Sequence, residues 1–377
     1  MTGPGVPGHQ SSWFQRYLLP GFAFKAVVIG GGYATGRELA EFFLPSGPWG
    51  GLAGMVLAMC LWSVIAALTF LMAHRLQAYD YRSFFKALLG PCWIMFEVAY
   101  VLFVILILSV FGASAGAIGA ALFDWPAYAG TVALAVCIAG FAAFGNSSVE
   151  RLFKYVSILL YAVYALFLVL GLISFGAGIG ASFSAEATGS GWAMGGITYA
   201  GYNIIGAVIV LPVLRHIGTD RDAVAAGLLA GPLAMAPAIV FFVCMAAFYP
   251  SIGNEALPSD FLLRQMHVPL FHVVFQTMIF AALLESGTGA VHAINERIAI
   301  FWRTRKGIEP GPKARGIVAV VLLVICMFAA QRFGLVALIA NGYRVLAYAL
   351  IIIYVLPLFA ACIYRLVRGR YFRSETV

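Results

Sequence analysis

Charge is scarce in this chain. Of its 377 residues only 10% are charged, against 63% that are hydrophobic, and the mean hydropathy is +0.96. Soluble globular domains carry roughly 25% charged residues, so this composition excludes a water-soluble globule of ordinary surface polarity. We therefore expect a polytopic membrane protein whose surroundings are the lipid bilayer.

Paired cysteines and two common catalytic motifs are missing as well. The six cysteines include no C-x-x-C pair, so their spacing indicates neither a disulfide framework nor a zinc site. No H-E-x-x-H zinc motif and no G-x-x-x-x-G-K-[ST] phosphate loop occurs, which argues against a metalloprotease and against ATP-driven transport. We expect no enzyme, no metal centre and no cofactor beyond a coupling ion.

The net charge of +8 does not indicate a nucleic-acid partner. The basic residues stand in short clusters between apolar stretches rather than on one soluble face, which is typical of topology signals. Residues 1–12 lack the charged start, short apolar core and small-residue cleavage site of a secretory signal. We expect no cleaved signal peptide.

Long apolar stretches are what the chain has in quantity. Ten can be drawn, each long enough to cross a hydrocarbon core of roughly 30 Å. They lie near residues 13–44, 50–73, 92–122, 126–144, 152–176, 191–214, 223–248, 267–300, 315–331 and 334–365. With both termini in the cytoplasm, 18 Lys and Arg residues lie inside and only Arg264 and Arg332 lie outside. This bias follows the positive-inside rule and predicts that orientation.

Glycine interrupts the first apolar stretch near its middle, where residues 28–38 read Val-Ile-Gly-Gly-Gly-Tyr-Ala-Thr-Gly-Arg-Glu. An unpaired backbone N–H or C=O group is costly in hydrocarbon, so such a break must face protein or a polar cavity. The sixth stretch, 191–214, shows the same oddity, because Gly195, Gly196, Gly201 and Asn203 replace ordinary helix formers.

Five helices separate these two stretches, so the two interrupted helices run in opposite directions. Such a pair is typical of an inverted-repeat transporter that holds its substrate at the breaks. The alternative is ordinary close packing of small residues. We predict an all-α polytopic membrane protein of about ten transmembrane helices, a 5+5 inverted repeat with discontinuous helices 1 and 6. Its parts are a short cytoplasmic N-terminus (1–12), a first repeat (13–176), an extracellular connection (177–190), a second repeat (191–365) and a basic cytoplasmic tail (366–377).

The run 30–38, followed by the phenylalanines at 42–43, resembles the first-helix motif of YkvI-type membrane proteins. The run 285–297 in the eighth stretch is similar as well. That family is related to the amino acid-polyamine-organocation superfamily. The resemblance implies the LeuT fold, with helices one, three, six and eight around the site, and a place in the bacterial inner membrane. It implies no particular substrate.

The backbone N–H groups that begin a half-helix suit an anion. In the superfamily the equivalent glycine turn receives the carboxylate of an amino acid, so the resemblance implies substrate contacts from Gly30, Gly31 and Gly32. Hydroxyl and amide side chains of both broken helices are further candidates, each with space filling as its alternative. These are Tyr33, Thr35, Tyr199, Tyr202 and Asn203.

Glu285 lies about halfway along the eighth stretch, where an ionised carboxylate is expensive unless it is paired or protonated. Pairing with Lys25 would make a proton-sensitive switch; the alternative for Lys25 is that it snorkels to the interface. In the superfamily this region of sodium-coupled members holds Na⁺, which makes Ser286 and Thr288 candidate ligands. Their spacing departs from the adjacent hydroxyls of many sodium users. His292 lies on the same face and is a candidate proton relay or a packing residue.

Four charged residues fall in the outer half of the bilayer, three in the first stretch and one in the tenth. Opposite charges at one depth form ion pairs. We expect an outer gate made of Arg37, Glu38, Glu41 and Arg344.

These patterns together indicate a secondary active transporter of a small organic solute, an amino acid or a related zwitterion or carboxylate. Coupling to H⁺ or to Na⁺ and alternating access of the two broken helices complete this hypothesis. The alternatives are an ion or small-solute channel that uses the same breaks, and a membrane sensor or scaffold that transports nothing. No pattern in the sequence indicates the substrate, the coupling stoichiometry, the direction of transport or the oligomeric state.

Overall fold

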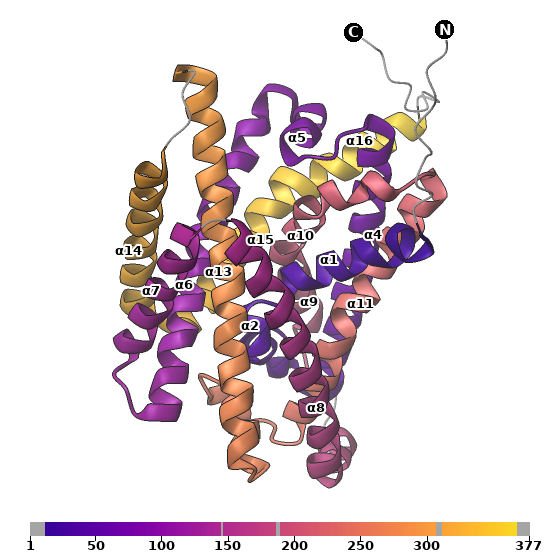
Figure 1. The fold of residues 1–377 in the computed structure, drawn as a ribbon. Coiled ribbons are helices and arrows are strands. Elements are labelled where there is room, and N and C mark those ends of the chain that lie inside the picture. Colours follow the sequence, from indigo (N-terminus) through magenta and orange to yellow (C-terminus); the bar gives the residue numbers. More distant parts are fainter. Residues whose placement is uncertain (1–11, 145, 186–188, 307–310, 368–377) are drawn as a thin grey trace, which may run out of the picture.

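A computed structural model describes residues 12–144, 146–185, 189–306 and 311–367. Every regular element within those ranges is helical, and none of them is a strand. The predicted helical class is therefore confirmed. The structure is a bundle in which long helices surround several short, interrupted ones (Figure 1).

Six stretches of the described residues are long and apolar enough to cross a membrane. They are Arg37–Leu76, Tyr81–Phe123, Ala162–Ser184, Asp220–Ala246, Pro269–Arg303 and Lys313–Tyr364, with Ala127–Phe141 as a shorter apolar helix. The interrupted helices fall below this length. The count of ten transmembrane helices and the 5+5 repeat stay predictions.

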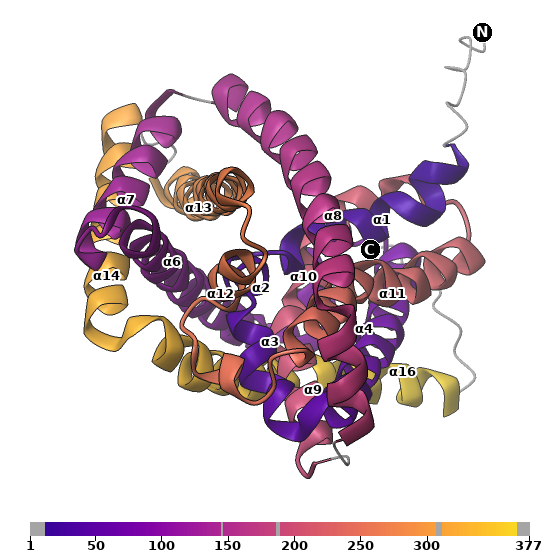
Figure 2. The ribbon, with the colours of Figure 1, turned by 90° about the horizontal axis from the view of Figure 1, so that it is seen from below.

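The long helices form two groups. Helix α4 packs against α11 and α9, and α11 also packs against α1; in the second group α6 packs against α7 and α14, with α13 beside α6 and α7. Figure 2 shows the two groups on opposite sides of the molecule. Their bounds are α1 Leu19–Val28, α4 Gly47–Leu76, α6 Ile94–Phe123, α7 Ala127–Phe144, α8 Asn146–Ala185, α9 Trp192–Asn203, α11 Asp220–Ala246, α13 Pro269–Lys306 and α14 Pro312–Ala337.

Small residues let α4 and α11 approach closely. A Cβ on Gly231 would meet the Met59 carbonyl oxygen and the Ser63 side chain, and one on Gly227 would meet the backbone of Ala67. The Ser63 hydroxyl donates a hydrogen bond of 2.9 Å to the Leu228 carbonyl across the contact. Such interfaces stabilise membrane helices by van der Waals packing, because lipid offers no hydrophobic driving force between helices.

The structure shows the predicted break in the first apolar stretch. Helix α1 ends at Val28, Ile29 leaves the helical region at φ −74° and ψ 78°, and Gly36 adopts φ +78°. The left-handed φ of Gly36 has no steric cost only because the residue carries no Cβ. Two short helices divide the remainder of the stretch, α2 Gly31–Ala34 and α3 Arg37–Phe42.

The sixth stretch is interrupted only at the end of the predicted region Gly195 to Asn203. Helix α9 continues through Gly195 and Gly201 to Asn203, Ile204 separates it from α10, and Val210 leaves the helical region before η4. A Cβ on Gly195 would overlap the Phe42 carbonyl oxygen, and one on Gly196 would come within 2.5 Å of the Gly54 carbonyl oxygen. These two glycines therefore serve close packing against α3 and α4, which was the alternative interpretation.

Gly334 bends the chain between the ninth and tenth stretches, at φ +74° and ψ 166°. The tenth stretch then alternates π-helical and α-helical turns: η6 Leu338–Tyr343, α15 Arg344–Leu350, η7 Ile351–Val355 and α16 Leu356–Val367. The remaining short elements are η1 Phe14–Leu18, η2 Leu44–Ser46, α5 Tyr81–Leu89, η3 Gly90–Trp93, α10 Ile205–Ile209, η4 Leu211–His216, η5 Ser251–Asn254 and α12 Pro258–Gln265.

Candidate functional site

A small cavity lies where the two interrupted stretches meet α6 and η6. Glu38, Tyr202, Asn203 and Tyr343 give it polar groups, and the Gly30 backbone closes one side. Its apolar lining comes from Val27, Val28, Phe103, Ile107, Phe111 and Ile205. Its volume of about 10 Å³ is roughly the room that one water molecule needs. In this conformation the cavity is therefore closed to any organic solute.

Glu38 is the acidic group of the cavity. Its side chain is only 3% exposed, and Oε2 accepts a hydrogen bond of 2.7 Å from the Tyr202 hydroxyl. The carboxyl group lies directly on Gly32, at the position that a Cβ there would occupy. The glycine turn thus forms a notch, and the chain fills this notch with its own carboxyl group.

Among the described residues Glu38 has no ion-pair partner, and Tyr202 supplies its one hydrogen bond. A buried carboxylate without a counter-charge is expensive. Either a proton or the positive charge of a ligand would relieve that cost.

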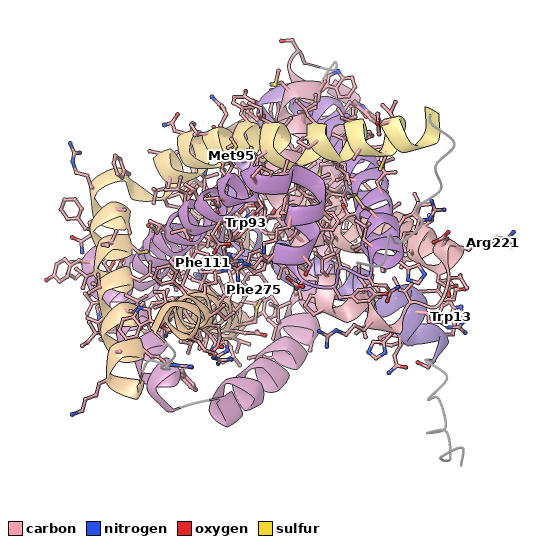
Figure 3. All side chains as sticks on the ribbon, turned by 90° about the horizontal axis from the view of Figure 1, so that it is seen from above. Trp13, Trp93, Met95, Phe111, Arg221 and Phe275 are labelled. Atoms are coloured by element: carbon pink, nitrogen blue, oxygen red, sulfur yellow. The ribbon has the colours of Figure 1, made fainter. Side chains whose placement is uncertain are left out.

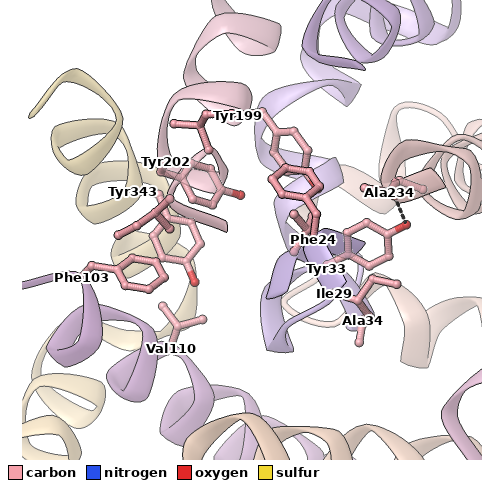
Figure 4. Close-up of a cluster of buried hydrophobic side chains, with 14 of the residues drawn as sticks. Phe24, Ile29, Tyr33, Ala34, Phe103, Val110, Tyr199, Tyr202, Ala234 and Tyr343 are labelled. Carbon is pink, nitrogen blue, oxygen red and sulfur yellow. Dashed lines mark hydrogen bonds between the residues drawn. The ribbon is translucent and has the colours of Figure 1, made fainter. Parts of the chain in front are cut away.

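Aromatic rings support this carboxyl group. The Tyr202 ring stacks on Tyr343 with a centroid distance of 4.4 Å, and Tyr199 meets Tyr202 edge-on at 5.6 Å. Figure 4 shows Tyr202, Tyr343 and Phe103 together on one side of this cluster. The Asn203 amide donates a hydrogen bond of 3.2 Å to the Tyr199 carbonyl, which orients it at the cavity edge.

The structure brings only some of the predicted substrate residues to the cavity. Gly30, Tyr202 and Asn203 line it, and Gly32 lies under the Glu38 carboxyl group. Tyr33 points the opposite way and donates a long hydrogen bond of 3.4 Å to the Ala234 carbonyl (Figure 4).

Two further predicted substrate residues, Thr35 and Tyr199, do not line the cavity. The Thr35 hydroxyl donates to the Gly32 carbonyl at 3.1 Å, which stabilises the turn itself. Tyr199 packs among Trp62, Phe42 and Phe43. Gly31 begins α2.

The predicted coupling residues lie on α1 and α13. Lys25, Glu285, Ser286 and His292 are partly buried. Thr288 is fully buried, and its hydroxyl donates to the Leu284 carbonyl of its own helix at 2.7 Å. The pairing of Lys25 with Glu285 and the role of each residue in coupling stay predictions.

Three of the four predicted gate residues meet at α3. Arg37 and Glu41 form an ion pair of 3.0 Å, and Arg344 approaches Glu41 at 3.9 Å. Glu38 does not join them, because it turns inward to Tyr202.

Arg37 also ties the loop after α11 to the broken helix. Its guanidinium Nη1 donates to the carbonyl oxygens of Gly253 and Glu255 at 2.8 and 2.9 Å. Close by, the Ser259 N–H donates to the Thr35 carbonyl at 2.9 Å. The loop is thereby fastened directly over the turn that precedes α3.

We expect replacement of Arg37 to loosen this loop. In a Ser259→Cys background, where position 259 is fully buried, Arg37→Met should raise the rate of modification by a membrane-impermeant thiol reagent. The rise should be about tenfold or more, since a hydrogen bond to a charged group contributes roughly 1.5 kcal/mol or more.

The control is Arg264→Met in the same background. Arg264 pairs with Asp260 and Glu255 in the same segment, but its side chain is 57% exposed, so its loss should matter little. Equal modification rates in the Arg37→Met variant and its parent would contradict a fastening role.

No protein-family model matches the chain. The uncharacterized membrane protein YkvI of Bacillus subtilis is 22% identical over 293 residues, which cover 74% of this chain and 80% of YkvI. This chain is a homologue of YkvI. The expected resemblance is confirmed by that comparison.

Solved transporter structures share the fold of this YkvI homologue. A variant of the manganese transporter of Eremococcus coleocola has a TM-score of 0.56 at 16% identity, covering 94% of this chain and 80% of its own. A Na⁺-coupled sialic acid symporter reaches 0.60 at 14% identity, covering 92% and 82%. MhsT in complex with L-phenylalanine reaches 0.53 at 18% identity, covering 92% and 87%. At these identities the likeness shows the fold alone, which is the LeuT fold of secondary transporters.

In the YkvI homologue, no three His, Cys, Asp or Glu side chains of the described ranges come together as metal ligands. Residues 112–116 read Gly-Ala-Ser-Ala-Gly, the spacing of a serine-hydrolase nucleophile elbow. That elbow requires a strand-to-helix turn, whereas these residues lie inside α6, where Gly112 and Gly116 approach Thr131 of α7. The spacing here reflects helix packing.

No pattern in the sequence indicated Tyr343 or Phe111 as lining residues. Phe111 stands among apolar and small residues, and Tyr343 stands between Asn341 and Arg344, which do not indicate the direction of its ring. Glu38 was recognised as a charged residue, but it was grouped with the wrong neighbours. Adjacent residues on a helix point about 100° apart, which separates Glu38 from Arg37.

Proposed function

We propose that this protein is a secondary active transporter of a small organic solute that carries a positively charged amino group, an amino acid or a related zwitterion. The observation that carries the proposal is the buried Glu38 carboxyl group at the break of the first helix, held by Tyr202 and without a counter-charge among the described residues. Structural neighbours that act on sialic acid, L-phenylalanine and manganese support transport as the class of activity.

Glu38 favours an amino group over an isolated carboxylate. A solute with only negative charge would meet the Glu38 carboxylate, and like charges at this distance are unfavourable. A zwitterion can place its ammonium group against Glu38 and its carboxylate near the N–H groups that begin α2. The Gly30 to Gly32 turn then retains the anion-binding role implied by the resemblance, in addition to its role as the notch for Glu38.

We take the proton as the coupling ion. A proton neutralises Glu38 when the site is empty, and an ammonium group replaces that proton when solute binds, so one group alternates between the two. This exchange corresponds to antiport of solute and proton. We place the protein in the bacterial inner membrane, with both termini in the cytoplasm. Sodium at Ser286 and Thr288 is the second proposal, favoured by the fold resemblance alone.

The test is uptake of labelled solute into proteoliposomes loaded with unlabelled solute, screened over amino acids, amines and carboxylates. We expect saturable counterflow of an amine-bearing solute, whose KM rises as the external pH falls, because protons compete for Glu38. The same KM at every pH would contradict proton competition. Fluxes at channel rates without counterflow would establish the channel instead, and binding without flux would establish the sensor.

A further inference from the structure

An apolar groove lies on the outer surface of the bundle, between α6 and the irregular tenth stretch. Its volume is about 770 Å³, and side chains such as Met95, Leu102, Leu106, Phe333 and Val345 line it. Asn341 is the one polar side chain in that lining. Val345 is 70% exposed, so the groove opens outward, toward the membrane.

The length of the groove fits one leaflet. On α6 the lining runs from Met95 to Leu106, which is 11 steps along the helix, or about 16 Å at 1.5 Å per residue. One leaflet of a hydrocarbon core of about 30 Å is of this depth. A helix of a second copy would extend through both leaflets, so the groove fits an acyl chain better.

The end of the groove at Met95 carries positive charge. Trp93 stands two residues before Met95, and the Arg82 guanidinium and the Lys86 ammonium both lie over its ring, at 4.9 and 5.6 Å from the centroid. Arg82 Nε is buried without a hydrogen-bond partner in the described part of the chain, where neither cation forms an ion pair.

Asp80 is the acidic neighbour of these cations in the sequence, and its charge is already engaged. Burial raises the pKa of this carboxyl group, but hydrogen bonds from the Ser83 side chain and from the N–H groups of Ser83 and Arg82, together with the positive charge of Arg82, lower it below its usual value. Asp80 therefore caps α5, while Lys86 is exposed and Arg82 is partly buried beside Trp93.

We propose that this groove holds one acyl chain of an anionic phospholipid whose phosphate head group binds Arg82 and Lys86. Basic residues at the cytoplasmic ends of membrane helices attract anionic lipids, and tryptophan is enriched at the same level of the bilayer. The charge at one end and the apolar lining of leaflet depth together select a lipid over a free phosphate ion or a second protein.

Only the wall formed by α6 and η6 separates the bound lipid from the candidate site. On α6, Leu106 lines the groove and Ile107 lines the cavity; on η6, Gly342 lines the groove and Tyr343 lines the cavity. Tyr343 stacks on Tyr202, the hydrogen-bond partner of Glu38. An acyl chain in the groove therefore supports the wall that holds the Glu38 carboxyl group.

The test is native mass spectrometry of the purified protein after exchange into mixtures of phosphatidylglycerol and phosphatidylcholine. Wild type should retain phosphatidylglycerol preferentially, and Arg82→Gln and Lys86→Gln should each lower that preference about fivefold, the contribution of one basic residue near the surface. The matched control is Arg221→Gln, an exposed basic residue on α11 far from Trp93 (Figure 3). Equal retention of the two lipids by wild type, or retention of inorganic phosphate in place of lipid, would overturn the proposal.

A second variant tests the acyl-chain groove separately. Val345→Trp should fill the groove and reduce the retention of bound lipid, whereas Val321→Trp on α14, 53% exposed and outside the groove, should leave it unchanged. If Val345→Trp instead converts a dimer to a monomer in light scattering, the groove is an interface between copies and the lipid proposal is wrong. If Val345→Trp does not fold, the two charge variants decide the question.

Discussion

Glu38→Gln should reduce uptake of an amine-bearing solute by about 100-fold or more. Truncating one partner of a buried charge pair costs about 2 to 5 kcal/mol, and about 2.7 kcal/mol corresponds to 100-fold in affinity. Glutamine keeps the length of the side chain and an oxygen that accepts from Tyr202, so the geometry of the wall is retained. The loss should therefore appear in transport and in its pH dependence, while the protein still folds.

Two further measurements make this result specific. The melting temperature of the variant should equal or exceed that of wild type, because a neutral amide is cheaper to bury than a carboxylate. The control, Glu296→Gln, alters a carboxylate that is 43% exposed and pairs with Arg315 away from the cavity, and it should transport normally. Normal, pH-dependent uptake by the Glu38→Gln variant would sink the proposed role of this residue.

Gly195→Ala should destabilise the protein by about 2 kcal/mol, within the usual range for overpacking a well-packed contact. The new methyl group would overlap the Phe42 carbonyl oxygen, a backbone atom that cannot rotate out of the way. The expected result is a clear fall in melting temperature in detergent. We expect transport to fall in proportion to the loss of folded protein, because α9 is an uninterrupted helix at Gly195.

Gly180→Ala is the matched control for that substitution. Gly180 lies in α8, and no atom stands within 4 Å of the place its Cβ would take. Alanine is better than glycine in a helix by about 1 kcal/mol, so this variant should be neutral or slightly more stable. Equal melting temperatures of the Gly195→Ala and Gly180→Ala variants would contradict the close contact between α9 and α3.

The low share of charged residues and the high share of hydrophobic ones were sufficient to predict a helical membrane protein. The residues that a chain exposes must suit the solvent around it, which here is the lipid bilayer. The glycine run at Gly30 also predicted a real break, and a side chain at Gly32 would overlap the Glu38 carboxyl group. The sixth stretch was harder to interpret. Glycine serves both an interrupted helix and a close helix contact, and only the position of Phe42 across the gap distinguishes these two uses at Gly195.

The direction of a side chain on an apolar helix was the least predictable property. Arg37 and Glu38 are adjacent charged residues at one depth, yet one holds a surface loop and the other fills an internal notch. Tyr33 and Tyr202 were equal candidates by residue type, and only Tyr202 reaches the cavity. A rotation of one residue about the helix axis exchanges such roles, and the sequence contains no measure of that rotation.

If the glycine turn binds the solute carboxylate as proposed, Glu38 is a competitor within the protein, because its carboxyl group already lies on Gly32. The carboxylate of an incoming zwitterion can take the glycine notch only when the Glu38 carboxyl group leaves it, so the measured affinity is the intrinsic affinity reduced by the fraction of molecules with a vacant notch. The ammonium group of the same solute attracts the departing carboxylate. A zwitterion therefore replaces the contact between Glu38 and Gly32 with two contacts of its own, one to the glycine notch and one to Glu38. A simple anion has no ammonium group to attract Glu38, so it loses the competition for the notch.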